Sequence, residues 1–143
     1  MSVPTKRFFL TWILSSILMF ILSYAWHGVI LNDFSRLTYP KEFFLVLAAF
    51  TYVFIGFVLV KFYEAKFLEK TFYHKPFFKG VTKGAMCGFI FFLIATVMGV
   101  SFNTGSGLKN LALDLAWQLI EQGLGGLLVG FMYASAEYRV LND

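Results

Sequence analysis

The chain has 143 residues, of which 59% are hydrophobic and 14% are charged, whereas soluble domains carry about 25% charged residues. This composition excludes an ordinary soluble enzyme. The net charge is +4, and most charged residues lie near the chain ends or between the long apolar stretches. This distribution argues against nucleic-acid binding. We therefore predict a single membrane domain that covers residues 1–143.

Four apolar stretches follow one another, at about residues 8–31, 43–63, 84–102 and 112–134. A helix of about 20 apolar residues matches a hydrocarbon core of about 30 Å. Because lipid offers no hydrogen-bond partners, each stretch must pair its backbone groups internally, as a helix does. The sequence predicts an all-α membrane protein, built as a bundle of four transmembrane helices.

The first stretch has an alternative interpretation as a cleaved signal peptide. Lys6 and Arg7 precede it, and residues 23–25 (SYA) resemble a cleavage site. The apolar run continues to Leu31, however, beyond the roughly 7–15 residues of a usual signal sequence. We favour a membrane span.

Residues 64–83, between the second and third stretches, alternate aromatic pairs with lysines. Aromatic rings and lysine ammonium groups both favour the headgroup region of a bilayer. We expect this basic loop to lie at the membrane surface and to contact anionic lipid headgroups, with Pro76 and Gly80 interrupting regular structure. The alternative is a docking face for a partner protein.

Basic residues are distributed unequally between the two sides that these spans define. Three of the twelve, Arg36, Lys41 and Lys109, lie on one side, and the other nine lie with the two termini and the basic loop. The positive-inside rule places the richer side in the cytoplasm. We predict a multi-pass protein of the bacterial inner (plasma) membrane with both termini cytoplasmic. The nine residues are Lys6, Arg7, Lys61, Lys66, Lys70, Lys75, Lys79, Lys83 and Arg139.

Small residues recur every fourth position in the third and fourth stretches. Such faces let helix backbones approach closely in lipid, where no hydrophobic effect drives helices together. We expect the third and fourth spans to pack against each other within one chain, and a homo-oligomer or a larger membrane complex is the alternative. The glycines concerned are Gly80, Gly84, Gly88 and Gly99 in one stretch, and Gly126 and Gly130 in the other.

Polar side chains interrupt the last stretch. Asp114, Gln118 and Glu121 follow at i, i+4 and i+7, which places them on one face of a helix, and Gln122 flanks this face. A charged group at the centre of a bilayer costs about 2.5–3.5 kcal/mol on insertion scales. This face must therefore point into the bundle.

Tyr24, Trp26 and His27 lie near the outer end of the first stretch, at a depth similar to that of the polar face. The two groups together predict a polar pocket that opens to the outside. We predict that His27 faces Glu121 or Asp114, because an unpaired carboxylate in hydrocarbon is costlier than a paired one. The alternative is that these groups bond one another only to hold the helices together.

The chain contains no nucleotide-binding loop, no Ser/His/Asp set and no cluster with metal-ligand spacing. We therefore expect no catalytic residue, metal or cofactor, and a non-enzymatic accessory or scaffold role. One alternative is a small oligomeric transporter or channel subunit that uses the outward pocket. Another is a haem- or quinone-binding protein that uses His27, although His74, the other histidine, falls on the opposite side of the membrane.

Two segments resemble a small bacterial family of four-span membrane proteins of unknown function. Residues 26–30 (WHGVI) resemble the Trp-Tyr-Gly-Pro-Leu element that ends the family's first span. Residues 108–119 (LKNLALDLAWQL) resemble its entry to the last span, where a leucine-lysine pair precedes an aspartate, an aromatic-histidine pair and a helix of small residues. Length and span number agree over nearly the whole chain. The resemblance implies a four-helix integral membrane protein.

The chain departs from this family pattern at four positions. His27 replaces the tyrosine, Val29 replaces the proline, and Gln118 stands where the family has histidine. Glu121 has no counterpart in the pattern. Because the family's own activity is unassigned, the resemblance implies no reaction or cargo.

Overall fold

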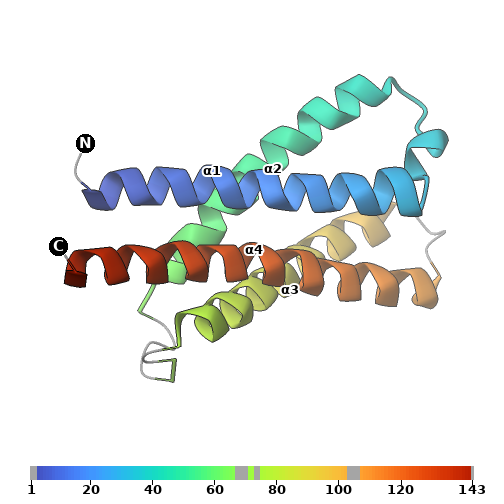
Figure 1. Ribbon diagram of the computed structural model, residues 1–143. Coiled ribbons are helices and arrows are strands. Elements are labelled where there is room, and N and C mark those ends of the chain that lie inside the picture. Colours follow the sequence, from blue (N-terminus) through green and yellow to red (C-terminus); the bar gives the residue numbers. More distant parts are fainter. Residues whose placement is uncertain (1–2, 67–70, 73–74, 103–106, 143) are drawn as a thin grey trace.

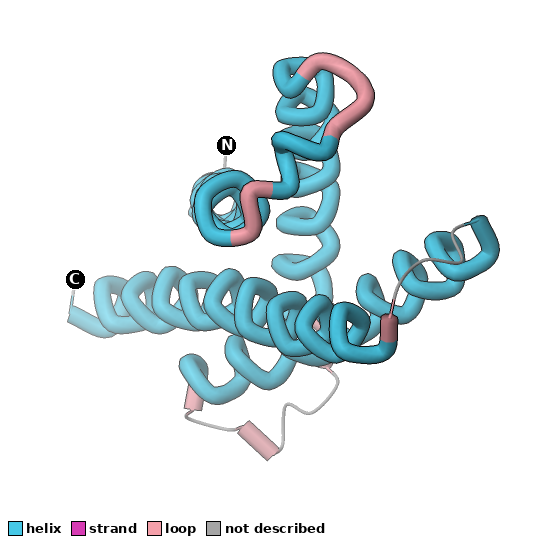
Figure 2. The backbone as a smooth tube through the Cα atoms, turned by 90° about the vertical axis from the view of Figure 1, so that its right-hand side faces the viewer, coloured by secondary structure: helices cyan, strands magenta, loops and turns pink. Residues whose placement is uncertain are grey.

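The computed structural model describes residues 3–66, 71–72, 75–102 and 107–142, with side chains described for residues 5–66, 71–72, 75–98 and 107–135. The chain forms helix α1 (Val3–Ser23), a π-helical segment η1 (Tyr24–Ile30), a 3-10 turn η2 (Asp33–Arg36), and helices α2 (Lys41–Glu64), α3 (Pro76–Phe102) and α4 (Leu108–Asn142). The described part of the chain contains helices and connecting loops and no strand (Figures 1 and 2). The all-α prediction is therefore confirmed.

Three helical segments are long and apolar enough to cross a membrane: Thr5–Ile30, Lys41–Glu64 and Pro76–Met98. Helix α4 is longer than any of them but less apolar, because Gln118, Glu121, Gln122 and several glycines dilute its hydrophobic residues. By length and composition, these three helices suit a membrane protein.

Helix α3 begins earlier than predicted, and this corrects the expectation of a basic loop over residues 64–83. Helix α2 extends to Glu64, and α3 starts at Pro76, so residues 76–83 are helical. Proline suits the first turn of a helix because its missing N–H needs no partner there. Gly80 does not interrupt the structure but lies within α3, where its small size serves helix packing.

Helices α3 and α4 pack backbone against backbone along their glycines. A Cβ atom added at Gly80 would overlap the carbonyl of Gly126, and one added at Gly126 would overlap the carbonyl of Gly80. In the same way, a Cβ atom added at Gly84 would overlap the Gln122 carbonyl, and one added at Gly130 would overlap the Pro76 carbonyl. This is the most extensive contact between helices in the described structure. The remaining predicted packing residues are Gly88, which lies against the Gln122 side chain, and Gly99, whose contacts lie outside the described residues.

Helix α1 joins α2 and α4 through a second set of close contacts. Gly56 of α2 lies against the Ser16 side chain, and the Trp12 indole N–H donates a hydrogen bond of 2.7 Å to the Val53 carbonyl. From α4, Gly125 faces Met19 of α1 and Leu59 of α2. The buried hydrophobic core is shared by all four helices, with Met19 from α1, Leu59 from α2, Cys87 from α3 and Val129 from α4.

Lys83, in the second turn of α3, is fully buried and caps the C-terminus of α2. Its ammonium group donates hydrogen bonds to the carbonyls of Phe62 (3.1 Å), Tyr63 (3.1 Å) and Ala65 (2.5 Å). The last carbonyls of a helix have no partner within the helix and carry partial negative charge. Lys83 satisfies them and links the start of α3 to the end of α2.

The start of α1, the end of α2, the start of α3 and the end of α4 lie at the same end of the bundle (Figure 1). Several cations at this end rest on aromatic rings. The Arg7 guanidinium lies 4.4 Å from the ring centre of Tyr133, and the Lys61 ammonium 4.3 Å from that of Phe8. The Tyr133 hydroxyl donates a hydrogen bond of 2.5 Å to Glu64. Arg7 and Lys61 are therefore held against aromatic rings of α4 and α1, respectively.

Candidate functional site

At the opposite end, the α1 helix widens into η1 before it reaches the loop. The Leu31 N–H donates to the Trp26 carbonyl at 2.9 Å, five residues back, as in a π-helix. Asn32 then adopts a left-handed conformation (φ 52°), which asparagine tolerates better than most residues. These two features turn the chain sharply into η2.

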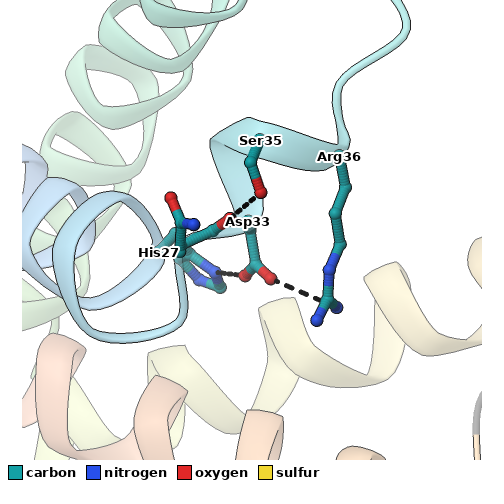
Figure 3. A network of polar contacts seen from close by, with 5 residues as sticks. His27, Asp33, Ser35 and Arg36 are labelled. Atoms are coloured by element: carbon teal, nitrogen blue, oxygen red, sulfur yellow. Dashed lines mark hydrogen bonds and ion pairs between the residues drawn. The ribbon is translucent and has the colours of Figure 1, made fainter.

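His27 projects from η1 toward this loop, where Figure 3 shows a short polar network. Its Nδ1 lies 2.9 Å from a carboxyl oxygen of Asp33, whose other oxygen lies 3.8 Å from the Arg36 guanidinium. The Ser35 hydroxyl donates to the Asn32 carbonyl at 2.8 Å. His27 therefore stabilises the loop that follows its own helix.

Trp26 connects this end of α1 to the start of α4. Its indole stacks on that of Trp117, with ring centres 4.4 Å apart and planes 5° from parallel. Tyr24 points to the other side, where its ring lies 5.5 Å from Phe34 and its hydroxyl 3.4 Å from the Lys41 ammonium. This end of the bundle thus carries one stacked indole pair and one tilted pair of aromatic rings.

The predicted pairing of His27 with Glu121 is wrong. His27 is bonded to Asp33, and Glu121 has Tyr52 and Trp117 as its neighbouring polar groups. Asp114 is close enough to His27 for an electrostatic interaction, but no hydrogen bond joins them in the described structure. Depth along the membrane did not determine the rotation of each helix, and the π-helical segment turns His27 toward the loop.

Glu121 and Gln122 instead lie in a second cluster, deeper in the bundle. Both side chains are fully buried, at 0% exposure. Tyr52, which interacts with Glu121, lies halfway along α2, so Glu121 sits near the middle of the bundle. Gln122 packs against Gly88 of α3. The cluster is therefore enclosed by α2, α3 and the polar face of α4.

Several polar atoms of this deeper cluster lack hydrogen bonds. The Glu121 carboxylate has the Tyr52 hydroxyl and the Trp117 indole N–H as its hydrogen-bonding neighbours. The amide oxygen and nitrogen of Gln122 and the amide oxygen of Gln118 are buried without a partner among the described residues. Leaving such atoms unpaired costs about 1–3 kcal/mol each, so a cluster of them points to an occupant.

The structure therefore divides the predicted outward pocket into two groups. One group lies at the end of the bundle opposite the start of α1 and comprises Tyr24, Trp26, His27 and Asp114. The other group, the mid-bundle cluster, contains Glu121 and Gln122. Gln118 lies one turn before Gln122 on α4 and extends this cluster toward the start of α4.

Three residues with structural roles were not singled out from the sequence: Asp33, which bonds His27, Tyr52, which neighbours Glu121, and Lys83, which caps α2. The hydroxyl of Tyr52, within a largely apolar stretch, could have indicated a polar contact inside the bundle. Asp33 looked like an ordinary loop residue, and Lys83 looked like part of the surface charge of the basic loop.

Comparison with protein-family models, curated proteins and solved structures finds no match. Membership of the four-span family suggested by the two motifs therefore stays a prediction. In the structure, the segments that carry this resemblance, residues 26–30 and 108–119, meet through the stacked indoles of Trp26 and Trp117.

Proposed function

We propose that this protein crosses the bacterial plasma membrane four times, with both termini in the cytoplasm, and acts as a non-enzymatic, ion-translocating subunit. One observation carries the proposal. The ionisable Glu121 and the adjacent Gln122 are fully buried near the middle of the bundle, and the Gln122 amide has no hydrogen-bond partner among the described residues. At 143 residues the subunit is small, so it would work as a homo-oligomer or within a larger membrane complex.

The composition of α4 supports a fourth crossing. Its polar side chains at positions 121 and 122 are buried inside the bundle, and large apolar residues such as Ile120 and Phe131 are exposed. A span of this kind presents its apolar face to lipid and hides its polar face. The basic end of the bundle is the side that the positive-inside rule assigns to the cytoplasm and that would contact anionic lipid headgroups.

A binding role for the mid-bundle cluster is better supported than a packing role. Polar residues that hold membrane helices together do so by hydrogen bonds between helices. Here the glycines of α3 and α4 supply the close contact, Glu121 has the Tyr52 hydroxyl of α2 as a neighbour, and the Gln122 amide makes no such bond in the described structure. An accessory or scaffold role would leave the buried Gln122 amide without a purpose.

The depth of the cluster also favours ion translocation. Secondary transporters place their substrate and coupling-ion sites near the bilayer midplane. An ionisable residue within a membrane span commonly marks an ion or proton pathway. The haem or quinone alternative gains less support, because His27 is engaged by Asp33 at the loop.

The proposal predicts that Glu121→Gln abolishes ion movement while keeping side-chain size. Purified protein in proteoliposomes should pass current under a NaCl gradient or a step in pH. Glu121→Gln should reduce this current about tenfold or more, because it removes the one intramembrane charge of the pathway. Currents are measured on a solid-supported membrane.

Glu64→Gln is the matched control. It makes the same chemical change in a carboxyl group at the basic end, bonded to Tyr133, and should leave the current close to that of the unaltered protein. A Glu121→Gln current equal to that of the unaltered protein would contradict the proposal, as would an unaltered protein that behaves like protein-free vesicles.

A further inference from the structure

We propose that the mid-bundle cluster binds a monovalent metal cation of the sodium class, held by Glu121 and by the amide oxygens of Gln118 and Gln122. This inference rests on the proposed function and names the ion that the site takes. The buried oxygen atoms of the cluster and its single carboxylate determine which ion fits.

Oxygen atoms dominate the unpaired groups. Two buried amide oxygens, those of Gln118 and Gln122, lack a partner, and beside them lie the two carboxyl oxygens of Glu121, whose hydrogen-bonding neighbours are the Tyr52 hydroxyl and the Trp117 indole. The unpaired N–H group beside them belongs to Gln122. A proton on Glu121 would satisfy one oxygen at most, whereas a hard cation is coordinated by several oxygens at once.

The spacing of the three residues places Gln118 between the other two. Gln118 is the helical neighbour of both Glu121 (i+3) and Gln122 (i+4) on α4, and these two project about 100° apart on either side of it. The Tyr52 hydroxyl approaches Glu121 from α2 and offers a further oxygen from a second helix. The cluster therefore offers oxygen ligands from two helices, α4 and α2.

The charge of the cluster selects a monovalent cation. Glu121 is its one carboxylate, and both glutamines and Tyr52 are neutral. A single positive charge would be neutralised by this carboxylate, whereas a divalent cation would leave one charge uncompensated in a medium of low dielectric constant, which is very costly. Ca²⁺ also takes about 6–8 oxygen ligands, more than this set offers, and Mg²⁺ usually retains several waters.

Equilibrium binding tests this assignment without any transport. Protein purified in detergent and freed of sodium is titrated with NaCl against choline chloride at constant ionic strength and pH. Tryptophan fluorescence and the thermal unfolding midpoint are followed, because Trp117 lies beside Glu121. We expect a saturable change in both signals with Na⁺ and none with choline, and titrations with Li⁺ and K⁺ show the preferred ionic size.

Two variants test the ligands. Glu121→Gln should abolish the Na⁺-specific response. Gln122→Met, which keeps the length of the side chain but removes its amide, should raise the half-saturating Na⁺ concentration about tenfold, equal to about 1.4 kcal/mol. Glu64→Gln, which alters a carboxyl group outside the cluster, should leave the titration unchanged.

The outcomes separate this inference from the proposed function. No Na⁺-specific response in the unaltered protein, or the same response in Glu121→Gln and Gln122→Met, would overturn the inference. A current carried by protons alone, without Na⁺ binding, would overturn it and leave ion translocation standing. Na⁺ binding without any current would support the site and overturn the translocating role.

Discussion

Replacing Gly126 with alanine is expected to destabilise the protein by about 2 kcal/mol or more, in the range of overpacked cores. The added Cβ atom would overlap the backbone carbonyl of Gly80 on α3. Backbone cannot rotate away as a flexible side chain can, so α3 and α4 must move apart. The free energy of unfolding is measured by a denaturing-detergent titration in mixed micelles.

Gly123→Ala is the matched control, three residues earlier on the same helix. A Cβ atom there would meet Val81 at 4.0 Å, an ordinary van der Waals contact. Because alanine favours a helix over glycine by about 0.5–1 kcal/mol, this control should be as stable as the unaltered protein or slightly more so. Equal stability of the two variants would contradict the backbone-to-backbone packing of α3 and α4.

Lys83→Met should destabilise the protein to a similar extent, with a loss of about 3 kcal/mol. The substitution keeps an unbranched side chain in the same space but leaves the carbonyls of Phe62, Tyr63 and Ala65 without their donor. Charged hydrogen bonds each contribute about 1.5–3 kcal/mol, and relief of the buried charge offsets part of the loss. The same unfolding titration measures it.

Lys79→Met provides the comparison for Lys83. It makes the same change one turn earlier on α3, where the ammonium group lies 4.6 Å from the ring centre of Tyr63. A cation–π contact of this kind contributes about 0.5–1 kcal/mol. If Lys83→Met were no less stable than Lys79→Met, Lys83 would not act as the cap of α2.

The helical class of the fold could be predicted from the sequence because membrane spans follow from length and hydrophobicity alone. Helix ends were harder. Pro76 and Gly80 suggest a break in a soluble context, yet Pro76 begins α3 and Gly80 lies within it. The distinction depends on which helix packs against Gly80, and that is a long-range property. The same holds for Lys83, whose burial depends on where α2 ends.

The candidate site could be predicted in composition but not in arrangement. The i, i+4, i+7 spacing indicated that Gln118 and Glu121 share a face, and Glu121 is indeed buried. The partner of Glu121 could not be inferred, because depth along the membrane leaves rotation about each helix axis undetermined. His27 contacts Asp33 from within a π-helical segment. No periodicity in the sequence predicts this segment.

The location of the C-terminus tests the central claim most directly, because it decides whether α4 crosses the membrane. Fusions at Asp143 to a fluorescent protein and to alkaline phosphatase are compared in a bacterial host, with matched fusions at Tyr39 in the loop between α1 and α2. Four crossings predict a fluorescent and phosphatase-negative C-terminus, and a phosphatase-positive fusion at Tyr39. Phosphatase activity at Asp143 would mean that α4 does not span the bilayer, and would contradict the account.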